Sequence, residues 1–177
     1  MLKKFNFKSA VIIVLILFIF FALFYLNQRE VTFLKIIDYR TANIVWQDKV
    51  NEENSFIIKY LHSVARTEVL EIFVVRDGEI VLVSTEYQSY GAGLPFSNEH
   101  QYLIEDDKFI IKNINQKLDN IMLRVSAYAE HQFIYQDKNY QLYELVPAET
   151  LLEFRTEKLS YFKFLTWEVK KWLNLKN

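Results

Sequence analysis

The apolar run near the N-terminus constrains this chain more than any other feature. Residues Ala10 to Leu26 are 17 consecutive residues without a charge, rich in Ile, Leu and Phe. At a rise of ~1.5 Å per residue, a helix over this run is roughly 25 Å long, which suffices to cross a thin hydrocarbon core. Since such side chains insert favourably near the bilayer centre, we expect the helix to bind membrane lipid.

The charges beside this run predict its orientation. Lys3, Lys4 and Lys8 precede it, whereas Arg29 and Glu30 follow it and cancel. Because positive residues stay on the cytoplasmic side, we expect a single-pass protein of the cell membrane. Its N-terminus is then cytoplasmic, and the rest of the chain after the run is extracytoplasmic.

A cleaved secretory signal is the alternative interpretation of this segment. Its basic start suits a signal, but the apolar run exceeds the usual ~7–15 residues. The sequence from Tyr25 to Arg29 also offers no pair of small residues for a signal peptidase. We therefore expect an uncleaved signal-anchor.

Charge and composition exclude several classes for the part outside the membrane. The chain has 21 Lys and Arg against 22 Asp and Glu, and removing the three N-terminal lysines leaves 18 basic against 22 acidic residues, or −4. This balance argues against nucleic acid as a partner. The chain has no Cys, so neither disulfides nor a lipidated N-terminal cysteine is available and stability must come from the core.

The pattern after the apolar run predicts a mainly β fold. Short apolar runs alternate with polar turns, which is typical of an antiparallel β-sandwich or a barrel-like domain. The predicted strands are Val31–Ile37, Asn43–Gln47, Ser55–His62, Glu68–Arg76, Glu79–Tyr87, Lys108–Ile114, Ile121–Ala127, His131–Tyr135 and Tyr140–Leu145.

A hairpin is the firmest local prediction within this fold. Asp77-Gly78 separates two apolar runs, and this dipeptide favours a two-residue type I′ turn. With that turn, Arg76 pairs with Glu79, Val75 with Ile80, Phe73 with Leu82 and Glu71 with Ser84. Glu71 and Glu86 then lie diagonally on one face, a separation that a glycosidase could use.

The C-terminal segment has a helical pattern instead. Pro147-Ala148-Glu149 resembles a helix start, and Leu159 to Leu175 has helical periodicity. This helix could pack on the β-domain, lie at the membrane surface or meet a partner's transmembrane segment. The expected organisation is a cytoplasmic tail (1–9), a transmembrane anchor (10–26), an extracytoplasmic β-domain (27–146) and an amphipathic helical segment (147–177).

Two short stretches contain the residues most suited to a functional site. One runs from Tyr60 to Thr67 and the other from Ser89 to Pro95. His62 and Ser63 cannot act as base and nucleophile within one strand, because adjacent side chains point to opposite faces. Three scattered His without Cys give no metal-ligand spacing. We therefore expect no catalytic residue, metal or cofactor.

The Gly91-Ala92-Gly93 segment admits two interpretations. It is either a structural turn or, with His62, Ser63 and Glu71, the rim of a polar pocket or partner contact. It lacks the third glycine of a dinucleotide fingerprint. The candidate ligand or partner contacts are His62, Ser63, Arg66, Glu68, Glu71, Gly91, Gly93, Leu94 and Pro95.

These two stretches resemble a bacterial family defined as domain of unknown function 1850. The resemblance rests on His62-Ser63-Val64, on the acids Glu68 and Glu71, and on Gly91-Ala92-Gly93-Leu94-Pro95, and it extends roughly from Ile36 to Tyr128. The chain departs from the family pattern at Ala65-Arg66, where many members have Glu-Lys. The C-terminal aromatic helix is also additional.

The resemblance implies a partner but no established activity. Such proteins are often encoded beside, or joined to, tripartite ATP-independent transporters that use a solute-binding protein. We therefore expect an accessory protein that contacts a transporter permease or its solute-binding protein. A small-anion binding module, using His62, Arg66 and Gly91–Gly93, and a hydrolase are the alternative hypotheses.

Overall fold

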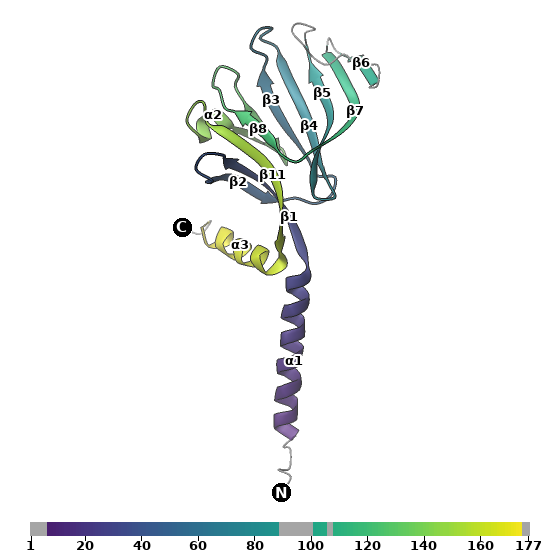
Figure 1. Cartoon of the computed structure of the whole chain (residues 1–177), viewed down its shortest axis with the longest axis vertical. Coiled ribbons are helices and arrows are strands. Elements are labelled where there is room, and N and C mark those ends of the chain that lie inside the picture. Colours follow the sequence, from purple (N-terminus) through teal and green to yellow (C-terminus); the bar gives the residue numbers. More distant parts are fainter. Residues whose placement is uncertain (1–6, 89–100, 106–107, 175–177) are drawn as a thin grey trace. The chain divides into compact units, whose positions relative to one another are not determined.

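The computed structural model describes residues 7–88, 101–105 and 108–174, and these form two compact units (Figure 1). One unit consists of Met1–Val31 with Lys158–Asn177, and the other of Thr32–Glu157. The helices in the described residues are α1 (Phe7–Gln28), α2 (Leu142–Leu145) and α3 (Tyr161–Asn174).

The larger unit is built from two antiparallel sheets, which confirms the predicted fold class (Figure 1). In the described part of the chain, one sheet has the order β2-β1-β11-β8 and the other β10-β9-β3-β4-β5-β7-β6. Their strands are β1 (Glu30–Asp38), β2 (Ile44–Lys49), β3 (Ser55–Leu61), β4 (Glu68–Arg76), β5 (Glu79–Tyr87), β6 (Gln101–Glu105), β7 (Lys108–Leu118), β8 (Ile121–Arg124), β9 (Gln132–Tyr135), β10 (Lys138–Gln141) and β11 (Leu151–Ser160).

Aromatic side chains from both sheets fill the space between them. The Phe56 ring on β3 stacks on Phe73 of β4 at 5.1 Å between centroids and on Phe154 of β11 at 6.5 Å. Phe133 of β9 lies 5.9 Å from Phe56 and 5.8 Å from Phe154. Because Phe154 belongs to the four-stranded sheet and the others to the seven-stranded sheet, these contacts join the two layers into a sandwich.

The hairpin of β4 and β5 has the predicted turn. Asp77 and Gly78 both have positive φ values, 54° and 77°, as a type I′ turn requires. The predicted pairs of Arg76, Val75 and Phe73 are present. The turn is also attached to the other sheet, because the Thr156 hydroxyl on β11 donates a 2.5 Å hydrogen bond to the Gly78 carbonyl.

The predicted pairing of Glu71 with Ser84 is wrong. A β-bulge at Val83 shifts the register, so that Glu71 lies opposite Thr85. Glu86 then lies opposite Leu70 and points to the other face of the sheet. Glu71 and Glu86 therefore do not form a carboxylate pair.

The helix start predicted at Pro147 is wrong, whereas the helix predicted over Leu159 to Leu175 is confirmed as α3. Leu151–Ser160 forms strand β11, inside the four-stranded sheet, and the helix begins only at Tyr161. The β-domain consequently extends past the predicted boundary at 146. Helix α2 also replaces the end of the strand predicted over Tyr140–Leu145.

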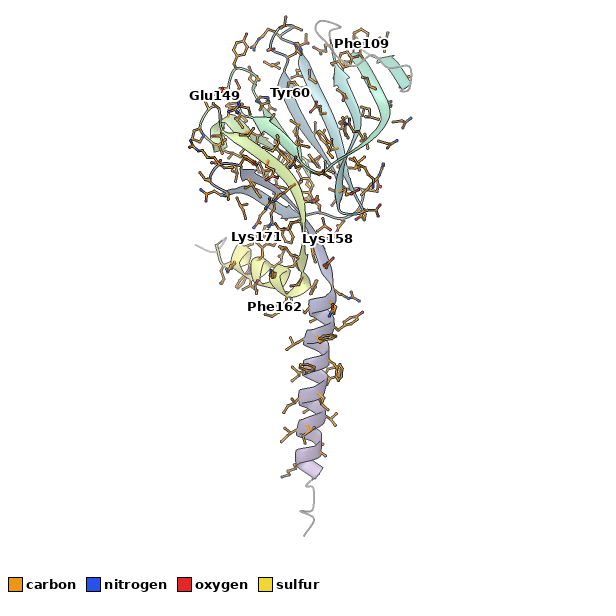
Figure 2. All side chains as sticks on the ribbon, viewed as in Figure 1. Tyr60, Phe109, Glu149, Lys158, Phe162 and Lys171 are labelled. Atoms are coloured by element: carbon orange, nitrogen blue, oxygen red, sulfur yellow. The ribbon has the colours of Figure 1, made fainter. Side chains whose placement is uncertain are left out.

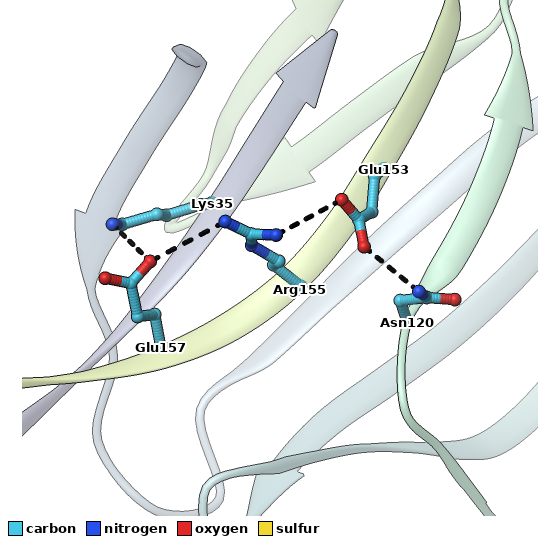
Figure 3. A network of polar contacts seen from close by, with 5 residues as sticks. All are labelled: Lys35, Asn120, Glu153, Arg155 and Glu157. Carbon is cyan, nitrogen blue, oxygen red and sulfur yellow. Dashed lines mark hydrogen bonds and ion pairs between the residues drawn. The ribbon is translucent and has the colours of Figure 1, made fainter. Parts of the chain in front are cut away.

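A row of polar contacts lies on the face of β11 opposite the core (Figure 3). Lys35 Nζ on β1 lies 2.6 Å from a Glu157 carboxylate oxygen, and Arg155 lies between Glu157 and Glu153 at 3.9 and 3.4 Å. Asn120 donates a 3.0 Å hydrogen bond to Glu153. The Lys35 side chain is only 10% exposed, so its ion pair with Glu157 offsets its loss of hydration and favours this alignment of β1 with β11.

In the smaller unit, α1 contains the predicted apolar run. The stretch Ala10–Gln28 is long and apolar enough to cross a membrane, and none of it is buried. A membrane anchor and a signal sequence both have these properties. At its end, Arg29 donates a 2.6 Å hydrogen bond to the Tyr25 hydroxyl, and the Tyr161 amide donates to the Arg29 carbonyl at 2.7 Å.

The positive φ of Gly78 gives a testable prediction for the turn. Gly78→Ala should lower the free energy of unfolding by about 1 kcal/mol, because a Cβ is disfavoured in the left-handed region. Gly78→Asn should lower it less, since asparagine tolerates that region. Urea unfolding of the full chain in mild detergent, followed by near-ultraviolet circular dichroism, measures both. Equal losses for Ala and Asn would contradict this account of the turn.

Candidate functional site

The His62–Thr67 segment forms a tight loop between β3 and β4. The His62 amide donates to the Thr67 carbonyl at 2.9 Å, and the Arg66 amide donates to the His62 carbonyl at 2.9 Å. The His62 ring closes the loop further, because its Nδ1 accepts the amides of Val64 and Ala65 at 3.3 and 3.2 Å. His62 therefore has a structural role in this loop that strand alternation alone did not predict.

Arg66 fixes the same loop to a distant segment. Its guanidinium donates a 2.8 Å hydrogen bond to the Tyr128 carbonyl and lies 4.2 Å from the centre of the Tyr128 ring. Nearby, the Leu61 amide donates to the Ala129 carbonyl at 2.7 Å. Arg66 itself has a left-handed backbone with φ 53°, which a non-glycine residue adopts only where its surroundings hold it there.

These contacts produce an exposed surface, which we name the loop surface, of Ser63, Val64, Arg66 and Tyr128. Val64 is 74% exposed and Tyr128 63% exposed, so both display large apolar area to solvent. Ser63 and Arg66 are exposed too. Sequence reasoning found Ser63 and Arg66 but not Tyr128, because a contact across 62 residues leaves no local pattern.

The two predicted acids lie on opposite faces of β4. Glu68 forms an ion pair with Lys59 on the outer face, where the two are diagonal neighbours across β3 and β4. Glu71 lies on the inner face, opposite Ile58 of β3 and Thr85 of β5. They do not form a common site, because three positions along a strand place two side chains on opposite faces.

Glu71 is a half-buried titratable group on the inner face of the seven-stranded sheet. Its carboxylate accepts a 3.4 Å hydrogen bond from the hydroxyl of Tyr60, which lies on β3 of the seven-stranded sheet (Figure 2). Burial raises the pKa of Glu71, although the Tyr60 hydrogen bond opposes this. Burial and the negative charge of Glu71 in turn raise the pKa of Tyr60. A carboxyl with a raised pKa can act as a proton donor, which is the main observation in favour of the hydrolase hypothesis.

His131 lies near this pair and was not among the predicted site residues. Its ring centre is 5.7 Å from that of Tyr60, and its Nδ1 accepts the Ser126 amide at 3.0 Å. Burial lowers the pKa of His131, so the neutral imidazole is favoured. Its sequence context contains no motif, and only the fold places it beside Tyr60.

The remaining predicted contacts belong to the Gly91–Pro95 segment. Gly91, Gly93, Leu94 and Pro95 lie outside the described residues. Their convergence with His62 and Glu71 stays a prediction. Within the described ranges, no group of three or more His, Asp or Glu side chains is arranged to hold a metal ion.

The fold and the loop surface define a two-sheet β-domain, preceded by an apolar helix, that displays a braced loop. The family model described as Domain of unknown function (DUF1850) matches residues 56–142, which supports the resemblance to that family over this part of the chain. The match begins within β3 and ends at α2, so it contains the entire loop surface. No curated protein and no solved structure matches the chain.

The ring of His62 provides a test of its structural role. His62→Ala should cost about 1 kcal/mol of stability and speed amide exchange at Val64 and Ala65, because both amides lose their acceptor. His62→Asn should retain most of the protection, since its Oδ1 occupies the position of Nδ1. Amide hydrogen exchange measures both variants. If Asn loses as much protection as Ala, the imidazole has another role.

The raised pKa of Glu71 predicts a pH-dependent difference in stability. The folded state retains the proton to higher pH than the unfolded state, so stability falls as pH rises between the ordinary and the raised pKa. Glu71→Gln has no titrating carboxyl at this position, so the variant does not lose this stability as the pH rises. Its stability relative to the wild type should therefore increase from acid to neutral pH and then level off.

Urea unfolding across this pH range measures that difference. His131 titrates in both proteins, so its contribution cancels when the two curves are subtracted. A difference that stays constant with pH would show that the Glu71 carboxyl is not perturbed by burial.

Proposed function

We propose that this protein is a membrane-anchored, extracytoplasmic accessory protein that binds a partner protein through its loop surface. The observation that supports this most is the exposed Val64 and Tyr128 on a backbone that Arg66 braces. The proposal assigns no reaction to the domain.

The chemistry of the loop surface suits protein recognition. Tyr and Arg are enriched among the residues that dominate binding energy, and an exposed Val beside them adds apolar area. The loop is held by the His62 ring and by the Arg66 contacts to Tyr128. Such bracing favours affinity, because little conformational freedom remains to be lost on binding.

Helix α1 supports the anchoring part of the proposal. Its apolar stretch Ala10–Gln28 is exposed along its length and has Lys3, Lys4 and Lys8 before it. Lipid would cover this surface, and the lysines would keep the N-terminus in the cytoplasm. The β-domain would then act outside the cytoplasm.

The family resemblance suggests which partner to expect. Relatives encoded beside tripartite ATP-independent transporters point to a transporter permease or to its solute-binding protein. Both are within reach of a domain that is attached to the outer side of the same membrane.

The small-anion alternative has less support from the described side chains. The Arg66 guanidinium already contacts the carbonyl and the ring of Tyr128, and His62 Nδ1 already accepts two amides. An anion would have to compete with these contacts. A thermal shift on adding a small acid, abolished by His62→Ala, would favour this alternative.

Substitutions on the loop surface test the proposed function. Val64→Asp and Tyr128→Ala should each weaken partner capture by roughly tenfold, as expected for a loss of more than about 1 kcal/mol at a central contact. Tyr39→Ala is the matched control, because Tyr39 is a similarly exposed tyrosine at 61% on a different loop. Capture of the full chain from membranes in mild detergent, with quantification of the permease and the solute-binding protein, measures the effect.

Two results would contradict the proposal. One is unchanged capture by Val64→Asp and Tyr128→Ala, provided that circular dichroism shows folded variants. The other is an equal loss with Tyr39→Ala, which would show that binding does not depend on the loop surface.

A further inference from the structure

Helix α3 has an apolar face that is open to solvent. The exposed residues lie within one third of the helix circumference, at spacings of three, four and seven positions. They are Phe162 (54% exposed), Leu165 (39%), Val169 (56%), Trp172 (55%) and Leu173 (49%). Figure 2 shows Phe162 and Lys171 on opposite sides of α3. An exposed apolar face of this kind is typical of a helix that binds a membrane or a partner.

The position of α3 next to the end of α1 indicates that membrane lipid covers the apolar face of α3. The Tyr161 amide, at the first residue of α3, donates a 2.7 Å hydrogen bond to the carbonyl of Arg29, directly after α1 ends. The Arg29 guanidinium lies 4.8 Å from the centre of the Tyr25 ring. Tyr and Arg at the end of an apolar helix are typical of the headgroup level of a bilayer. Helix α3 thus begins where α1 would leave the membrane.

Helix α3 is too short and too charged to cross the membrane as a second span, and these properties favour a position at the membrane surface. Its 14 residues extend about 21 Å at ~1.5 Å per residue, and they include Lys163, Glu168, Lys170 and Lys171. The three lysines lie away from the apolar face, as the polar side of an interfacial helix requires. Figure 1 shows α3 running across the direction of α1.

We infer that α3 is an interfacial helix whose apolar face is embedded in the outer surface of the bilayer that α1 crosses. Trp172 and Phe162 lie among the upper acyl chains, and the lysines lie among the phosphates. The helix gives the protein a second membrane contact, which fixes the orientation of its C-terminal end at the lipid surface. This inference rests on the anchoring role of α1 in the proposed function.

The absence of cysteine makes a site-specific test direct. Three variants of the full chain, each with one cysteine, are spin-labelled in vesicles of phosphatidylcholine and phosphatidylglycerol: Val169→Cys on the apolar face, Lys170→Cys on the polar face and Ile19→Cys within α1. Electron paramagnetic resonance then compares collisions with oxygen, which concentrates in lipid, and with a water-soluble nickel complex. Val169 and Ile19 are both 56% exposed, so the protein shields the two positions equally.

The inference predicts a several-fold higher ratio of oxygen to nickel accessibility at residue 169 than at residue 170. A label at 169 that meets mainly nickel would overturn it, because the face would then be in water. A label at 169 that meets neither reagent would also overturn it, because protein rather than lipid would cover the face.

The label at residue 19 separates this inference from the proposed function. Lipid exposure at 19 without lipid exposure at 169 means that α1 anchors the chain while α3 does not enter the bilayer. Loss of the protein from the vesicles, or nickel access at 19, means that the anchor itself fails, and the inference fails with it.

Discussion

The aromatic contacts between the two sheets hold the β-domain together. Phe56 and Phe133 of the seven-stranded sheet contact Phe154 of β11, and no disulfide can supplement this packing in a chain without cysteine. β11 and β1 are neighbours in the four-stranded sheet. Strand β1 follows α1 and β11 precedes α3, so the same core fixes the two strands that connect to the helices.

The loop surface also depends on the joining of the two sheets. Tyr128 lies on the connection from β8, in the four-stranded sheet, to β9, in the seven-stranded sheet. Arg66 lies on the β3–β4 loop. Its guanidinium donates a hydrogen bond to the Tyr128 carbonyl and lies over the Tyr128 ring. The surface therefore exists only when both sheets are formed. The loop surface therefore depends on the fold, and not on the loop sequence alone, for its shape.

The sequence predicted local features well and long-range ones poorly. The bounds of β4 and β5 were confirmed because their apolar residues are separated by Asp77-Gly78, a strong turn signal. The bulge at Val83 was missed because residues 81–83 are Val-Leu-Val. With or without the bulge, apolar residues lie on both faces of the strand there. β11 was missed because Pro147-Ala148-Glu149 resembles a helix start, whereas its pairing depends on β1 and β8. An ion pair such as Lys35 with Glu157 joins residues 122 apart and has no local signature.

The candidate site shows what strand periodicity does predict. Glu68 and Glu71 are three positions apart, so alternation alone places them on opposite faces, and the structure agrees. Their environments differ accordingly: Glu68 is paired with Lys59 outside, whereas burial raises the pKa of Glu71 inside. The acids after the His-Ser-Val segment therefore cannot act together on one substrate. The described residues of the candidate site are thus divided between the inner face of the seven-stranded sheet and a braced, exposed loop.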